Sequence, residues 1–177
     1  MLETLISSKT RVKLLLKFFL NSSTTAYLRN LESEFGESSN AIRLELNKLE
    51  EAGMLSSFSE GNKKMFQANS KHPLFGDIHS ILMKYIGLDQ IVEKIASNLG
   101  DLDEVYLSGD FAKGLDSSII DLIFIGNNIN KSYLMELVDK SEKLVKRKIR
   151  YIIYSRSELN IEAISNKAIL LLWSNEK

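Results

Sequence analysis

The sequence contains no cysteine and only one proline among its 177 residues. The lack of cysteine excludes disulfides, thiolate metal sites and cysteine nucleophiles. No apolar run approaches the length of a membrane span, and the first residues lack the basic and apolar segments of a signal peptide. We therefore expect a cytoplasmic protein that does not bind a membrane.

The chain also lacks an excess of charge of either sign. It has 23 Lys and Arg residues against 23 Asp and Glu residues, so the formal net charge is zero. Any binding of nucleic acid must therefore come from a local cluster of basic side chains rather than from a global field. His72 and His79 are the only histidines, and we expect neither a metal site nor a cofactor.

Residues 37–67 hold the strongest pattern, a polar-capped helix followed by a short hairpin. Ser38 or Ser39 is the expected N-cap and Gly53 the expected stop, which predicts a helix over residues 39–52. Gly61 and Asn62 lie between two strand-like runs, as in a β-hairpin. The apolar stripe that the helix should bury consists of Ile42, Leu46, Leu49 and Ala52, with Leu44 beside it.

A line of polar side chains lies opposite that stripe, because Asn40, Arg43 and Asn47 recur at helical spacing. Arg and Asn are the side chains that read guanine and adenine edges, and lysines at the hairpin tip suit phosphates. A polar helix face and a lysine-bearing hairpin also occur in three-helix domains that bind no DNA. The candidate DNA-binding residues are Ser39, Asn40, Arg43, Asn47, Lys48, Asn62, Lys63 and Lys64.

Two further helices are predicted upstream, over residues 8–21 and 26–35, so the order is helix, helix, helix, hairpin. Residues 5–70 resemble the winged-helix regulators of the arsenic-repressor (ArsR-like) type. The segments that carry this resemblance are residues 8–15, 27–31, 38–53 and 61–64. It implies a DNA-binding module that dimerises on a palindromic site. Metal-sensing members bind the metal through cysteines or histidines. The lack of cysteine, with two histidines at which we expect no metal site, argues against metal sensing here.

Pro73 breaks the chain just after the hairpin, and two amphipathic helices are predicted over residues 74–85 and 88–99. We expect a winged-helix domain at 1–71, a helical linker at 72–100 and a second domain at 101–177. The linker helices could pack on the second domain or form the seam of a homodimer. The sequence leaves both arrangements open.

The second domain shows short strands around one helix, which predicts a small α/β domain and an α+β chain overall. Strands are expected at 105–107, 119–125 and 149–154, with a glycine-bearing turn at 108–114 and a helix at 129–145. The apolar run at 168–173 is assigned as a strand, with a helix as the alternative.

The chain resembles the minimal nucleotidyltransferases in the order of its elements: a strand, the motif Gly-x-Phe-Ala-x-Gly at 109–114, and a second strand that carries an acidic residue. That resemblance implies a serine beside the first glycine, two metal-binding carboxylates one residue apart and a third on a later strand. The chain departs from it at each place, with Asp110, Ile119 and Arg150 in those positions. The vestigial nucleotide site would comprise Gly109, Asp110, Lys113, Asp121 and Arg150.

Since only Asp121 remains of the carboxylate set, we expect a domain without enzymatic activity, with Asp110 or Asp116 as the candidates for a replacement ligand. Three functions stay open. The leading hypothesis is a transcriptional regulator that binds double-stranded DNA, whose second domain senses a nucleotide or other small anion or holds a dimer together. The alternatives are an active nucleotidyltransferase with an attached DNA-binding domain, as in toxin–antitoxin pairs, and a protein-interaction scaffold.

One more cluster carries charge of one sign, the cations of residues 146–148 with Arg150. At the end of a helix such cations are commonly solvated and favoured by the helix dipole. The alternative is a site for a nucleotide, another anion or the DNA backbone.

Overall fold

The computed structural model of the chain describes residues 5–158 and 168–175 and shows a mixed helix and sheet (α+β) protein. The chain divides into two compact units, Met1–Tyr85 and Ile86–Lys177, which we call the N-unit and the C-unit. The division falls inside the predicted helical linker. None of the helices in the described ranges has the length and apolar character of a membrane-spanning segment.

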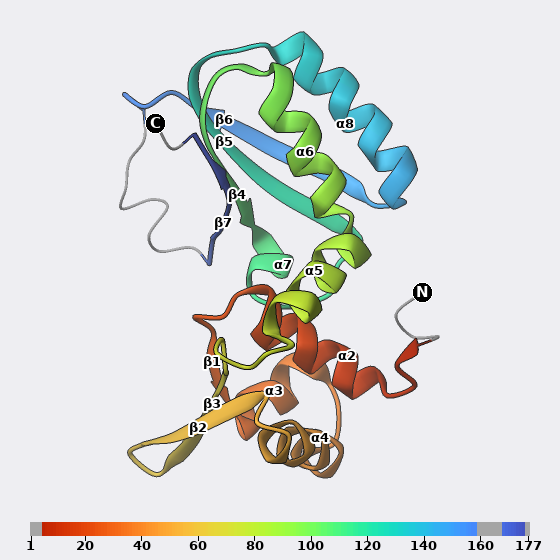
Figure 1. The fold of residues 1–177 in the computed structure, drawn as a ribbon, viewed down its shortest axis with the longest axis vertical. Helices are drawn as coiled ribbons and strands as arrows, with labels where there is room; N and C mark the ends of the chain where they lie inside the picture. Colours follow the sequence, from red (N-terminus) through yellow and green to blue (C-terminus); the bar gives the residue numbers. More distant parts are fainter. Residues whose placement is uncertain (1–4, 159–167, 176–177) are drawn as a thin grey trace. The chain divides into compact units, whose positions relative to one another are not determined.

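The N-unit combines helices with a three-stranded antiparallel sheet of order β1-β3-β2 (Figure 1). Its elements in chain order are α2 (Lys9–Leu15), the π-helix η1 (Leu16–Leu20), β1 (Thr25–Tyr27), α3 (Leu28–Phe35), α4 (Ser39–Glu51), β2 (Leu55–Glu60), β3 (Lys63–Ala68) and α5 (Phe75–Ile86).

The first predicted helix, over residues 8–21, is present but changes its winding halfway. Its second part is η1, where all five residues are buried, including Lys17, whose Nζ lies 2.6 Å from a Glu34 carboxylate oxygen. The second predicted helix begins two residues late. Ala26 and Tyr27 form part of β1 and pair with Phe66 and Met65, so the expected helix over residues 26–35 was wrong at its start.

The helix α4 follows the prediction at both ends. The Ser38 hydroxyl accepts a hydrogen bond from the Ala41 amide, and Gly53 adopts φ +72°, which ends the helix in the left-handed conformation that glycine favours. Ile42, Leu46 and Leu49 are buried as expected.

Ala52, the last residue of the expected stripe, is exposed at the C-cap instead, and Leu44, beside the stripe, is 52% exposed. The remaining buried position belongs to Glu45, which Arg11 of α2 neutralises. A charged pair therefore occupies a position on α4 that the apolar pattern does not indicate.

The predicted hairpin is confirmed. Gly61 and Asn62 form its two-residue loop, Gly61 has φ +58°, and Glu60 pairs with Lys63 across the turn. Met65 and Phe66 are buried, whereas β2 is exposed from its second residue to its end. The hairpin thus presents one polar strand to solvent.

The C-unit is a four-stranded mixed sheet of order β6-β5-β4-β7 with two helices on one face (Figure 1). Its elements are α6 (Leu88–Asn98), β4 (Gly100–Ser108), the single turn α7 (Gly109–Ala112), β5 (Ile119–Ile129), α8 (Lys131–Val145), β6 (Lys148–Tyr154) and β7 (Leu170–Ser174). Strands β5 and β6 run parallel and are joined through α8, and the other pairings are antiparallel.

The buried run that starts at Ile119 is the central strand β5, as predicted, and it continues to Ile129. Leu122 and Phe124 pack with Leu134 and Leu137 of α8 and Ile91 of α6 beneath the helices. The final run is strand β7, so the strand assignment is confirmed over the helix. Strand β4 is longer than predicted, because pairing with β5 and β7 extends it to Gly100.

Candidate functional site

A groove of about 630 Å³ lies in the N-unit between α3, α4 and the hairpin. Its walls are formed by β1, α3, α4, the hairpin turn and β3, which the fold brings together from residues 27–66. The lining residues are Tyr27, Leu28, Arg29, Glu32, Ser39, Arg43, Leu46, Asn47, Asn62, Lys63, Lys64 and Phe66.

Six of the eight predicted DNA-binding residues line this groove, namely Ser39, Arg43, Asn47, Asn62, Lys63 and Lys64. Asn40 and Lys48 are exposed on α4 but do not line it, and Lys48 lies 3.7 Å from Glu45 instead. Arg29 was missed by the sequence analysis. Its position in the first turn of the helix before α4 was the available signal, since that turn faces the same ligand in a helix pair.

Three cations in the groove have no acidic partner among the residues that the structure describes. Within the described ranges, no carboxylate lies at ion-pair distance from Arg29, Arg43 or Lys63. Lys63 instead places its Nζ 4.6 Å from the centroid of the Tyr27 ring, a cation–π contact that directs the lysine without neutralising it. The groove is therefore a local concentration of positive charge on a chain of zero net charge.

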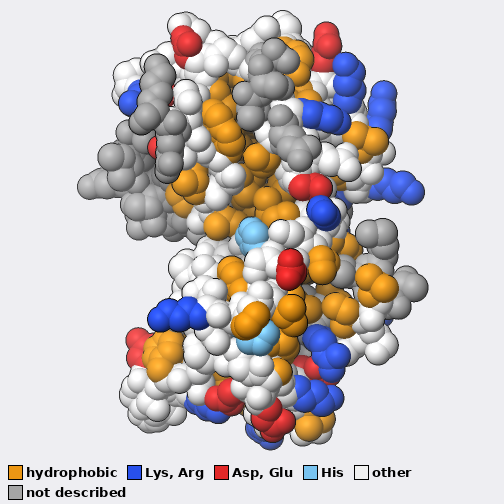
Figure 2. Space-filling view, viewed as in Figure 1, with side chains coloured by type: hydrophobic (Ala, Val, Ile, Leu, Met, Phe, Trp, Pro, Cys, Tyr) orange, Lys and Arg blue, Asp and Glu red, His pale blue; other side chains and the backbone are white. Residues whose placement is uncertain are grey.

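Acids also lie in and near the groove, and Figure 2 shows acidic and basic side chains together over α4. The Ser39 hydroxyl donates a hydrogen bond to the Glu32 carboxylate, which ties the first turn of α4 to α3. Ser39 is thus already bonded within the protein. The amide and guanidinium groups of Asn47 and Arg43 are the more available of the predicted base-reading groups.

Lys64 differs from its neighbour Lys63. Its Nζ lies 2.6 Å from a carboxylate oxygen of Glu50, near the C-terminal end of α4. The other oxygen of that carboxylate accepts a hydrogen bond from the Ser57 hydroxyl on β2. The hydrogen bonds from Lys64 and Ser57 lower the pKa of Glu50, so the carboxylate stays ionised at neutral pH.

An ion pair fixes α4 against the first helix. Arg11 donates from Nε to one oxygen of Glu45 at 2.7 Å and from a terminal nitrogen to the other at 3.3 Å. Burial by itself would raise the pKa of Glu45, but the hydrogen bond and charge of Arg11, with Ser8 and Lys48, outweigh it and lower the pKa. A two-point contact of this kind restricts rotation of α4 about its axis.

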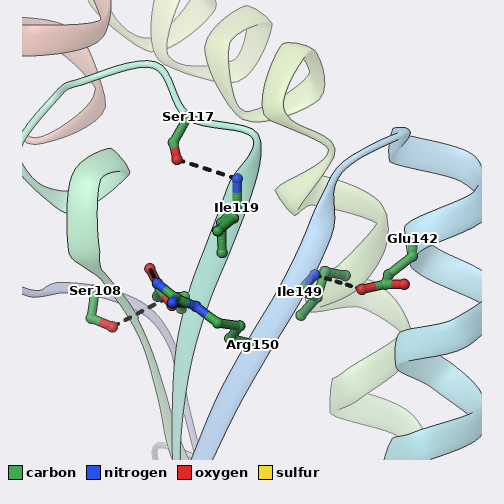
Figure 3. Close-up of polar contacts among 7 residues, drawn as sticks. Ser108, Ser117, Ile119, Glu142, Ile149 and Arg150 are labelled. Carbon is green, nitrogen blue, oxygen red and sulfur yellow. Dashed lines mark hydrogen bonds and ion pairs between the residues drawn. The ribbon is translucent and has the colours of Figure 1, made fainter.

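In the C-unit, the structure brings Ser108, Asp121 and Arg150 side by side across three strands. Figure 3 shows Arg150 reaching from β6 toward β5, where its Nε and a terminal nitrogen donate to the two Asp121 oxygens at 2.7 and 2.9 Å. The Ser108 hydroxyl donates to the backbone carbonyl of Asp121. The anionic group that Arg150 binds is therefore Asp121, the one carboxylate left of the expected metal-binding set.

Gly109 lies directly beside this pair. It adopts φ +69°, and a β-carbon at this position would overlap the Asp121 carboxylate. Asp110 and Lys113 are both exposed, in α7 and at its C-cap. The hydrogen bond and charge of Asp121, with Asp110 nearby, raise the pKa of Arg150, so the guanidinium is firmly cationic.

The chemistry of this residue set does not fit a magnesium site. Ile119 lies on β5 where the resemblance implies a carboxylate, and the guanidinium of Arg150 contacts both oxygens of Asp121. No group of three His, Asp or Glu side chains able to hold a metal occurs within residues 5–158 and 168–175. Asp116, a candidate replacement ligand, lies 3.0 Å from Arg147.

The predicted basic cluster is largely neutralised by the C-unit itself. Arg147 pairs with Asp116, donates to the Ser117 carbonyl and lies 5.1 Å from the Phe111 ring centroid. Lys148 lies 2.9 Å from Glu142, which also accepts from the Ile149 amide. These contacts join the ends of α8, β5 and β6, which favours a structural role for the cluster.

No protein-family model matches the chain, and no curated protein matches it at a significant level. Among solved structures, a candidate nucleotidyltransferase from Sulfolobus solfataricus is 30% identical, covers 56% of this chain and 88% of its own, and has a TM-score of 0.38. A possible transcriptional regulator for arsenical resistance is 21% identical, covers 54% of this chain and 91% of its own, and has a TM-score of 0.31.

A third neighbour, a hypothetical protein from Pyrobaculum spherical virus, is 13% identical, covers 93% of this chain and 95% of its own, and has a TM-score of 0.30. The neighbours thus include both kinds of protein that the sequence resembles.

Proposed function

We propose that the chain is a DNA-binding transcriptional regulator whose N-unit is a winged helix. The observation that carries this proposal is the groove between α3, α4 and the hairpin, where Arg29, Arg43 and Lys63 have no acidic partner among the described residues. Unpaired cations held beside an exposed helix suit a phosphate-lined double helix.

In this proposal α4 enters the major groove of double-stranded DNA. Arg43 and Asn47 read base edges, since guanidinium and amide groups form paired hydrogen bonds with guanine and adenine. Arg29 and Lys63 meet the backbone on either side, where they position the protein without reading sequence. Asn40, about two turns before Asn47 on α4 and exposed, is a further candidate for contact with the DNA.

We propose further that the protein acts as a homodimer. One small module whose charges nearly balance has too few contacts for high affinity, and a two-fold dimer doubles them on a palindromic site. Of the two linker helices, α6 packs its Ile91 against β5 and α8 of the C-unit, so α5, where Ile81 is 49% exposed, is the candidate for the seam. Light scattering at tens of micromolar should give the mass of a dimer, and a monomeric mass would remove this part of the proposal.

For the C-unit we propose a nucleotidyltransferase-like domain that does not transfer nucleotides. The bidentate contact of Arg150 with Asp121 supports this, because a guanidinium held against the carboxylate repels a divalent ion. The domain could still bind a nucleotide or another small anion. Pure protein with labelled ATP, CTP, GTP and UTP and magnesium or manganese should release no pyrophosphate, and turnover lost in Asp121→Asn would contradict this.

The experiment that tests the DNA proposal is selection of duplexes from a random pool, followed by fluorescence anisotropy with the selected duplex and with a scrambled one. We expect preference for the selected sequence and a steep decrease in affinity with salt. Absence of binding to any duplex at low salt would contradict the proposal.

A further inference from the structure

Glu50 makes a three-way contact that joins α4 to both strands of the hairpin. One carboxylate oxygen accepts from Ser57 on β2 and the other pairs with Lys64 on β3. Ser57 faces Phe66 across the hairpin, and Lys64 faces Ser59. Ser57 and Lys64 are therefore diagonal neighbours on one face, and a single carboxylate bridges them.

The two adjacent lysines of the hairpin differ in what they contact. Lys64, 54% exposed along its side chain, is held by Glu50 at 2.6 Å and lies 5.0 Å from the Phe66 ring centroid. Lys63 contacts the Tyr27 ring, and no acidic side chain within the described ranges lies at ion-pair distance from it. Of these two adjacent cations, Lys64 is therefore paired with a carboxylate, whereas Lys63 is not paired with any among the described residues.

We infer that Glu50 is a positioning residue that holds Lys64 in an internal ion pair, docks the hairpin on α4 and leaves Lys63 as the hairpin lysine that meets the DNA backbone. This inference rests on the proposed DNA-binding function and assigns the division of work within it. It follows that only one of the two lysines at the hairpin tip, Lys63, contacts a DNA phosphate, while Lys64 stays paired with Glu50.

A lysine that neutralises one DNA phosphate changes the slope of log affinity against log salt by about 0.9. Lys63→Ala should therefore flatten the slope by about this amount, whereas Lys64→Ala should leave it nearly unchanged. Glu50→Gln keeps the size of the side chain and releases Lys64, so the slope should steepen by about 0.9 if Lys64 then reaches a phosphate. Lys64→Ala in the Glu50→Gln background should remove that gain.

Glu51→Gln is the matched control. Glu51 is the exposed neighbour of Glu50, and its substitution removes the same charge at the end of the same helix. It should raise affinity slightly through net charge without steepening the slope. Equal slopes for Lys63→Ala and Lys64→Ala in the wild-type background would overturn the inference. So would equal behaviour of the Glu50→Gln and Glu51→Gln variants.

A readout without DNA separates this inference from the proposed function. Carboxylate NMR of the free protein should show Glu50 titrating below the ordinary glutamate range, and Lys64→Ala should move that titration upward, whereas Lys63→Ala should not. If no duplex binds but this titration behaves as expected, the DNA proposal fails and the ion pair stands. If Glu50 does not respond to Lys64→Ala, the inference fails whatever the DNA result.

Discussion

The two units use arginine in opposite ways. All three arginines of the C-unit are bonded to aspartates of the same unit: Arg147 to Asp116, Arg150 to Asp121 and Arg156 to Asp103. In the N-unit only Arg11 has such a partner, Glu45, while Arg29 and Arg43 line the groove without one among the described residues.

This difference separates charges that hold the fold together from charges that are available to a ligand. The aspartate-bound arginines of the C-unit join strands and loops, so a new anion must first displace an internal carboxylate. The two unpaired arginines of the N-unit lose only water on binding an anion. Each unit contains three arginines, so the count of positive charges alone does not reveal which of them are available to a ligand.

The sharpest way to test the comparison is to damage one unit and measure the function assigned to the other. Phe124 is fully buried in β5, and Phe124→Ala should lower the free energy of unfolding of the C-unit by about 3–5 kcal/mol. Below the unfolding transition, DNA affinity should stay within twofold of wild type. Chemical denaturation and anisotropy measure the two quantities.

The exposed Leu144 of α8 provides the control, since Leu144→Ala removes a side chain that is 58% exposed. Its effect on the unfolding transition should be small. Loss of DNA binding in Phe124→Ala under conditions where the protein stays folded would show that the groove of the N-unit is not sufficient for binding.

The next effect is on specificity. Arg43→Ala should weaken binding to the selected duplex by about 1–3 kcal/mol and relax base preference, because a bidentate contact with guanine is lost. Arg156→Ala is the matched control from the C-unit, an arginine that is 68% exposed along its side chain and paired with Asp103. Equal losses in both variants would remove the distinction between paired and unpaired arginines.

The elements on which this comparison depends were predictable where the signal is local. The Ser38 cap, the Gly53 stop and the Gly61-Asn62 turn fix α4 and the hairpin within a few residues of sequence. The strand β1 was not predictable in this way. Its three residues become a strand only because β3, about 40 residues later, offers an unpaired edge.

The same reason explains what was missed in the sites. Arg150 and Asp121 become partners through the register of parallel strands β5 and β6, which no local pattern specifies. The contact of Glu50 with Lys64 likewise needs the folded hairpin. Residue types that suit a ligand could be identified from sequence. The internal ion pairs that make some of these residues unavailable to a ligand could not.

A smaller effect tests how tightly Gly109 packs against the Arg150–Asp121 ion pair. Gly109→Ala should destabilise the C-unit by about 1–2 kcal/mol, the cost of a left-handed conformation for a residue with a β-carbon. The added carbon also displaces the Asp121 carboxylate from Arg150. Thermal unfolding measures the loss, and Gly76→Ala is the control, because nothing lies within 4 Å of a β-carbon there. Equal shifts in both variants would contradict a tight fit at Gly109.

The smallest effect concerns pH and the one arginine of the N-unit that has a partner. The pKa of Glu45 is lowered from its ordinary value of 4.5, since Arg11 outweighs the opposing effect of burial. A lowered folded pKa means that ionised Glu45 contributes stability above the ordinary value and that this contribution is lost as pH falls through the folded pKa.

Glu45→Gln keeps the shape but cannot ionise, so it should be less stable than wild type at neutral pH, and the gap should narrow as the solution is acidified below about pH 4.5. Denaturant midpoints measured from pH 7 to pH 3 provide the test, with Glu51→Gln as the charge-matched control. A gap that stays constant with pH would mean that Arg11 does not stabilise the ionised carboxylate. In that case packing, and not the Arg11–Glu45 ion pair, would hold α4 against α2.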